Sequence, residues 1–154
     1  MPSRRDIDPS EVPQFLPHLQ LTEVIDGGER FRYRLVGTSI VEAFGAEFTG
    51  KYVDELFSGD RNSFTHEFYH TVCAAKRPAF ARSRYLGTKE VELTANRLLM
   101  PLSADGVQVN MILGALTFEF ASQISTRVGR DAQIDLAASS IEIVDTANDT
   151  ATGG

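Results

Sequence analysis

Three side chains with metal-binding chemistry lie close together in the sequence. His66, His70 and Cys73 follow an i, i+4, i+7 spacing, which places them on one side of a helix and can bind zinc. Phe64 and Phe68 fall on the opposite side, because each helical residue advances by about 100°. If the phenylalanines face the interior, the histidines face water and form an ordinary polar helix face. We therefore predict no metal site at these residues.

No other residue pattern predicts catalysis. The sequence contains no P-loop and no G-x-S-x-G, H-E-x-x-H or C-x-x-C motif. Asp54 and Glu55 are adjacent, so their side chains diverge on a helix and are poorly placed to work as a pair. Cys73 is the single cysteine, which excludes an internal disulfide and fits a reducing compartment. We predict that the chain is not an enzyme.

The composition limits the classes of partner. The chain has 154 residues, enough for one domain, and 42% of them are hydrophobic. Its net charge is −6, so Arg30, Arg32 and Arg34 fit the solvated face of a hairpin better than a nucleic-acid patch. No apolar run nears the ~20 residues of a membrane span, and the N-terminus has no secretory signal. We expect a cytoplasmic protein that binds neither nucleic acid nor membrane.

Alternating and helical hydrophobic patterns predict one α+β domain. The predicted strands cover residues 19–25, 30–36, 79–86, 89–102 and 107–120. One long helix is expected over Asn62–Lys76, with short helices before it. Five antiparallel strands are thus divided by a helical middle, so the helices must cover one face of the sheet. A short helix over residues 9–16 is predicted ahead of the first strand, limited by prolines.

Four segments together carry a family pattern. They are DIDPSEVPQFLPHL, FRYRLVGTSIVEAFG, FTGKYVDEL, and RLLMPLSADG followed by an apolar final strand. Over roughly residues 3–120 the chain resembles the PAS domain, and more narrowly a single-domain PAS family common in alphaproteobacteria. The resemblance implies a five-stranded antiparallel sheet, one long helix laid along it, and short helices that enclose a pocket. It divides the chain into a leader (1–18), a PAS core (19–120) and a C-terminal extension (121–154), which we expect to be partly disordered.

The resemblance also implies which side chains face the pocket. Phe31, Tyr33 and Leu35 would point towards it, with the arginines of the same strand on the other face of the sheet. Phenylalanine and methionine form an adaptable apolar cavity that suits a small hydrophobic metabolite, although each such residue could equally be ordinary core. The candidate ligand-binding residues are Tyr33, Phe44, Phe48, Phe64, Phe68, Val72, Met100 and Met111.

Neither flavin nor haem is expected in this pocket. Some PAS subfamilies attach flavin through a cysteine in an N-C-R-F-L-type motif, and Cys73 lacks that context. A haem in the pocket would meet Phe64 and Phe68 instead of a histidine.

Two functions remain open from the sequence. The first is a sensory or regulatory domain that binds a small, largely apolar ligand and signals to a partner protein in trans. The second is a ligand-free dimerisation or interaction module whose cavity is filled by its own side chains. We expect a homodimer, with the leader as a possible part of its interface.

Overall fold

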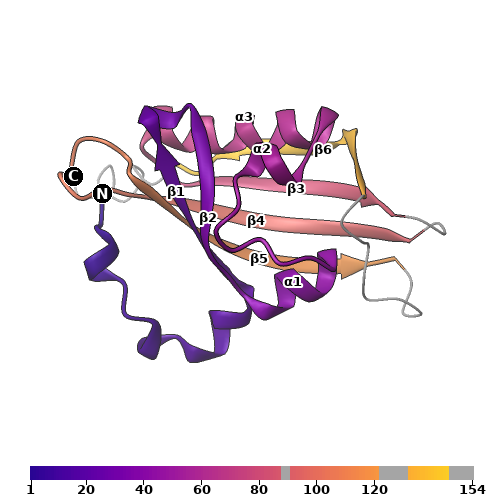
Figure 1. The fold of residues 1–154 in the computed structure, drawn as a ribbon, viewed down its shortest axis with the longest axis horizontal. Helices are drawn as coiled ribbons and strands as arrows, with labels where there is room; N and C mark the ends of the chain where they lie inside the picture. The colour runs from indigo at the N-terminus through magenta and orange to yellow at the C-terminus, as the bar shows by residue number, and fades with distance from the viewer. Residues whose placement is uncertain (88–90, 122–131, 146–154) are drawn as a thin grey trace, which may run out of the picture.

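Six antiparallel strands form a single sheet with the order β2-β1-β5-β4-β3-β6 (Figure 1). The computed structural model describes residues 1–87, 91–121 and 132–145. The strands are β1 (Leu19–Ile25), β2 (Arg30–Val36), β3 (Ala79–Leu86), β4 (Glu92–Leu102), β5 (Met111–Phe120) and β6 (Gln133–Ile143). The α+β class and the antiparallel sheet divided by a helical middle are as predicted.

The helices gather between the second and third strands. They are α1 (Thr38–Phe44), α2 (Val53–Leu56) and α3 (Gly59–Ala75). The long helix α3 packs against β3, β4 and β6, and α2 packs against β2. We call the sheet face beneath α3 the inner face. No helix in the described part of the chain is both long and apolar enough to cross a membrane.

Helix α3 begins three residues earlier than predicted. The predicted helix began at Asn62, whereas in the structure Ser58 is extended and is the N-cap, and Asp60 lies in the first turn. An acidic residue is favourable there because it complements the positive end of the helix dipole. Phe64, Phe68 and Val72 lie at i, i+4 and i+8 and are all buried, as expected for the face towards the sheet.

The sixth strand, β6, was not predicted, so the expectation of five strands was incomplete. It pairs with β3 through Ala81 and Ile141 and through Tyr85 and Ile134. The two isoleucines are an odd number of residues apart, and both contact the core only because the pairing shifts register between Arg82 and Arg84. Because of that shift, the inward-facing residues of β6 do not follow a regular two-residue alternation that could be recognised in the sequence. Residues 122–131 and 146–154 of the predicted extension lie outside the described residues.

A register shift also corrects the predicted orientation of Leu35. Phe31 and Tyr33 are buried as expected, but Leu35 is 56% exposed. Tyr33 pairs with Thr22 while Leu35 pairs with the adjacent Leu21, so β2 contains an extra residue at this point. Adjacent residues of a strand point to opposite faces, so the shift moves Leu35 to the outer face of the sheet.

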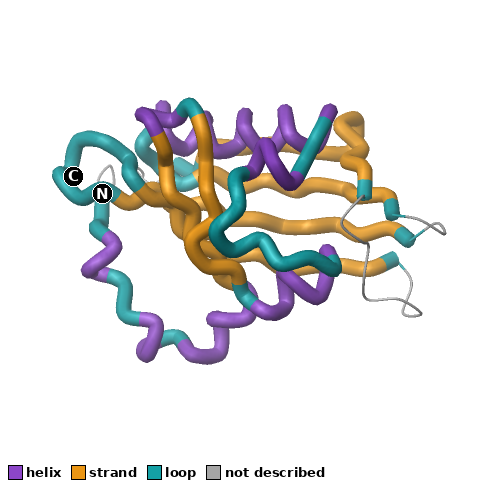
Figure 2. The backbone as a smooth tube through the Cα atoms, in the orientation of Figure 1, coloured by secondary structure: helices purple, strands orange, loops and turns teal. Residues whose placement is uncertain are grey.

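The leader forms three 3₁₀ turns in place of the single short helix predicted over residues 9–16 (Figure 2). The turns cover Arg4–Asp6, Pro9–Glu11 and Pro13–His18. The carboxylate of Asp8 accepts a hydrogen bond of 2.9 Å from the backbone N–H of Ser10, which fixes the second turn. Prolines begin the second and third turns, since proline suits a first helical position but prevents continuation of the preceding turn.

Candidate functional site

An aromatic cluster fills the space between the short helices and the inner face. Helix α1 ends at Gly45, whose φ of 68° lets the chain turn back and bring Phe48 towards Phe44, with ring centroids 6.1 Å apart. Phe48 also contacts the rings of Tyr33 and Phe57, each at 5.6 Å. The rings come from β2, α1 and the segments around α2, so this cluster joins the helices to the sheet.

The structure brings six of the eight predicted ligand-binding residues into one core and leaves two apart. The six are each 6% exposed or less: Tyr33, Phe44, Phe48, Phe64, Phe68 and Val72. Met100 pairs with Leu113 in β5, and Met111 pairs with Leu102. Both methionines are half-buried and alternate with the inward-facing Leu99 and Ile112, so they lie on the outer face.

Arg97 is a charged side chain in the middle of the inner face. It lies in β4 opposite Ala81 and Leu116, and it is only 6% exposed. Its guanidinium lies 5.6 Å from the ring centroid of Tyr85. Burial lowers the pKa of Arg97, because removal from water disfavours the charged form, and the nearby Tyr33 and Tyr69 oppose this shift.

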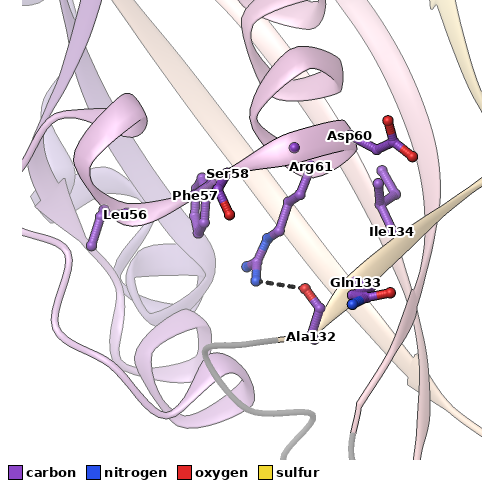
Figure 3. A pocket seen from close by; sticks show the side chains of 9 residues that line it. Leu56, Phe57, Ser58, Asp60, Arg61, Ala132, Gln133 and Ile134 are labelled. Carbon is purple, nitrogen blue, oxygen red and sulfur yellow. Dashed lines mark hydrogen bonds between the residues drawn. The ribbon is translucent and has the colours of Figure 1, made fainter.

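Arg61, in the first turn of α3, is the second buried arginine. Its guanidinium lies over the rings of Phe57, Phe44 and Tyr85, at 4.0, 4.7 and 5.1 Å from their centroids. Its Nη1 donates a hydrogen bond of 3.2 Å to the carbonyl of Ala132 (Figure 3). The side chain therefore ties the start of α3 to the start of β6.

A pocket of about 450 Å³ opens beside Arg61, between the α2–α3 junction and β6 (Figure 3). Phe57, Arg61 and Ile134 belong both to its wall and to the buried part of the protein. The complete lining is Leu56, Phe57, Ser58, Gly59, Asp60, Arg61, Ala132, Gln133 and Ile134. This opening adjoins the aromatic cluster through Phe57.

Several hydroxyl groups face the same interior, and they differ in their partners. Tyr69 Oη accepts a hydrogen bond of 2.6 Å from Gln20 Nε2 and lies 3.3 Å from Thr22 Oγ1. Ser83 Oγ and Tyr85 Oη are buried and have no hydrogen-bond partner among the described residues. Most buried hydroxyls are bonded, so these two are exceptions that need an explanation.

The two histidines of α3 differ in exposure: His70 is exposed, as the sequence predicted, whereas His66 is half-buried. His66 packs against the ring of Phe31 at 5.6 Å, and its Nε2 is buried without a partner. His70 Nε2 donates a hydrogen bond of 2.6 Å to the carbonyl of Gly28 and so holds the β1–β2 turn against α3. Both rings lie beside Phe31 of β2, with centroids 5.6 Å away for His66 and 5.2 Å for His70.

Cys73 lies on the same helix as the two histidines and is half-buried. Burial raises the pKa of the Cys73 thiol to about 11, which keeps it protonated and unreactive at neutral pH. Within residues 1–87, 91–121 and 132–145, no group of three His, Cys, Asp or Glu side chains could hold a metal ion.

The arginines of β2 lie on the outer face among carboxylates. Arg30 forms a bidentate pair with Asp54, at 2.9 and 2.7 Å, and its guanidinium lies 3.6 Å from the ring centroid of Tyr52. Arg32 and Arg34 both pair with Glu23. These contacts fit the solvated hairpin face predicted from the sequence.

A second, larger cavity lies between the leader and the outer face of the sheet. It measures about 810 Å³ and is lined largely by apolar side chains, including Phe15, Phe80, Leu98 and Leu113. Phe15 is 53% exposed and Phe80 is 36% exposed, so large apolar groups face solvent at its rim. The leader thus covers this face only in part.

The sequence analysis missed Arg97 and Arg61, although both carry a detectable signal. Arg97 continues the inward alternation of Leu93 and Ala95 in β4, so its position in the strand already predicts a buried charge. Arg61 lies three residues before Phe64, on the same side of α3.

Comparison with known proteins gives one match. A family model described as PAS domain matches residues 1–117, which include the leader, all three helices and most of β5. Searches of curated proteins and of solved structures found no match.

Proposed function

Because the chain belongs to the PAS domain family, we propose that it binds a small, largely apolar ligand and signals in trans through contacts with another protein. PAS domains are generally sensory and interaction modules and not catalysts, which agrees with the lack of catalytic motifs in the sequence. We propose that this chain works in the same way, as a non-enzymatic protein of the cytoplasm.

One observation supports ligand binding most strongly: the pocket at the α2–α3 junction adjoins the aromatic cluster. Phe57 forms part of the pocket wall and also contacts Phe48 inside the cluster. Helix α2 is a single short turn, so it can move with little loss of helical hydrogen bonding. A ligand that enters here would shift α2 and the start of α3, and thereby change the surface offered to a partner.

Thermal shift across a metabolite panel tests this site. Ser58→Trp places a large ring at the pocket wall, whereas Ser63→Trp places the same ring on the exposed side of α3. We expect ligands that raise the melting temperature of the natural protein to do the same for Ser63→Trp and to lose the effect for Ser58→Trp. Equal responses of the two variants would contradict a ligand site at this pocket.

We also propose that the leader-covered outer face is the surface of a homodimer. The exposed apolar rim around Phe15 and Phe80 supports this proposal, because apolar groups gathered at a cavity are typical of protein contacts.

Light scattering coupled to size exclusion should give a dimer for the natural protein and for Ala74→Asp, an exposed control on α3. Phe15→Asp or Phe80→Asp should give monomers; a monomeric natural protein would contradict the dimer.

A ligand-free interaction module is the second candidate. The six inner residues predicted to bind ligand are 6% exposed or less and pack against one another, as expected for a filled core. In that case the protein would dimerise normally, and no compound would change its melting temperature. The thermal shift experiment therefore separates the candidates.

A further inference from the structure

Arg97 carries a positive charge in the interior without an anionic partner. Its Nε is fully buried and has no hydrogen-bond partner, and no carboxylate pairs with it within the described residues. In the same part of the chain the buried charged side chains are Arg61 and Arg97, and no aspartate or glutamate is buried with them. An isolated buried charge is strongly unfavourable unless an opposite charge compensates it.

Two further polar side chains, Ser83 and Tyr85, lie near Arg97 on the inner face of the sheet. Arg97 stands opposite Ala81 in the β3–β4 ladder, yet its guanidinium reaches the ring of Tyr85, whose strand partner is Leu93. The side chain therefore runs along the inner face across the intervening Ser83–Ala95 pair. Small residues at Ala81, Ser83 and Ala95 leave room for it. Ser83, whose Oγ is unpartnered, belongs to that pair, and Tyr85, whose Oη is unpartnered, supplies the ring that the guanidinium reaches.

Together these groups form a set of hydrogen-bond donors without an acceptor. A guanidinium binds a carboxylate through two parallel N–H donors, and hydroxyl groups can donate to the remaining oxygen lone pairs. A carboxylate carries a single negative charge, which matches the single positive charge of Arg97. The rings of Phe44 and Phe118 lie close by, 5.8 Å apart, and provide apolar surroundings for the rest of a ligand.

We propose that the inner face of the sheet binds a small monocarboxylic acid with an apolar body, whose carboxylate pairs with Arg97 and accepts hydrogen bonds from Ser83 and Tyr85. The inference rests on the ligand-binding function proposed above and specifies its chemical class. The pocket at the α2–α3 junction is the route of entry, because Arg61 in its wall and Arg97 inside both lie over the ring of Tyr85.

Matched pairs of probes test the charge of the ligand. Octanoate and phenylacetate are compared with 1-octanol and 2-phenylethanol by calorimetric titration into the full chain, with inorganic phosphate as a further anion. We expect at least one acid to bind more than about ten-fold tighter than its alcohol, because only the acid neutralises Arg97. Equal binding of acid and alcohol would overturn this inference and leave the proposed function standing. If phosphate binds as tightly as the acids, the proposal that the ligand is a monocarboxylic acid with an apolar body is contradicted. If no probe binds, this inference fails, and the thermal shift across the metabolite panel decides the proposed function separately.

Substitutions at the donors test the position of the carboxylate. Arg97→Met should remove the preference for acid over alcohol, and the unliganded variant should melt at least as high as the natural protein, because a buried unpaired charge is lost. Tyr85→Phe keeps the ring and removes only the hydroxyl, so it should weaken acid binding by about three-fold or more without loss of folding. Arg82→Met, on the exposed outer face of the neighbouring strand, is the matched control and should bind as the natural protein does. Unchanged acid preference in both Arg97→Met and Tyr85→Phe would contradict the site.

Discussion

Two buried tyrosines differ in a way that single substitutions can measure. Tyr69 Oη is bonded to Gln20, whereas Tyr85 Oη has no partner. Tyr69→Phe leaves the amide of Gln20 buried without an acceptor and should lower the free energy of unfolding by about 1–3 kcal/mol. Tyr85→Phe should not lower it, because the hydroxyl that it removes makes no hydrogen bond within the described residues. Urea denaturation of both variants gives the comparison, and equal losses would contradict the assigned bonds.

His66 should make stability depend on pH. Burial, followed by the charge of His70, lowers its pKa below the ordinary value of 6.5, and Asp54 partly opposes this. Below that value the unfolded chain binds a proton that the folded protein binds less readily, so stability falls as the pH decreases from about 6.5. Melting temperatures between about pH 7.5 and 5.5 should fall less for His66→Gln than for the natural protein. Parallel curves would count against a buried, neutral His66.

At the scale of elements, Gly37 determines whether the leader can dock. A Cβ at this position would lie 2.2 Å from the backbone carbonyl oxygen of Pro17 and 2.6 Å from that of Leu16. Backbone atoms cannot rotate away as a side chain can, so the leader itself must shift. Gly37→Ala should therefore cost about 1–3 kcal/mol and expose the leader to protease before the sheet unfolds. Thr38→Ala, exposed at the next position, is the control and should be cut at the natural rate.

The strands show how far a sequence predicts this fold. In β4, Leu93 and Ala95 face inward as regular alternation requires, and the same rule extends to Arg97. The register shifts next to Leu35 and within the β3–β6 pairing could not be predicted, because they arise from contacts between strands and not from either strand alone.

The candidate site was predictable to a similar degree. Helical and aromatic patterns located the buried residues of α1 and α3, including Phe44 and Phe68. Met100 and Met111 were grouped with them because the leader makes the outer face apolar as well, so hydrophobicity alone does not distinguish the two faces. The unpartnered state of Arg97 depends on the arrangement of distant elements and is visible only in the structure.

At the scale of the whole molecule, the account predicts a colourless protein. The cluster offers phenylalanine and tyrosine rings towards the interior, and both α3 histidines are engaged elsewhere, at Phe31 and at Gly28. An absorbance scan of freshly purified protein should therefore show no band above the ultraviolet range. A Soret band, or flavin absorption in the blue region of the spectrum, would contradict this prediction and would indicate a bound cofactor.

The central claim is that the interior of this PAS domain takes up a small molecule. Native mass spectrometry of the freshly purified protein, compared with its denatured mass, tests that claim most directly. We predict a mass excess in the native spectrum that disappears on denaturation and whose released component is an acid detected in negative-ion mode. An unmodified native mass, with no change in melting temperature across the metabolite panel, would contradict the claim and favour an interaction module with a filled core.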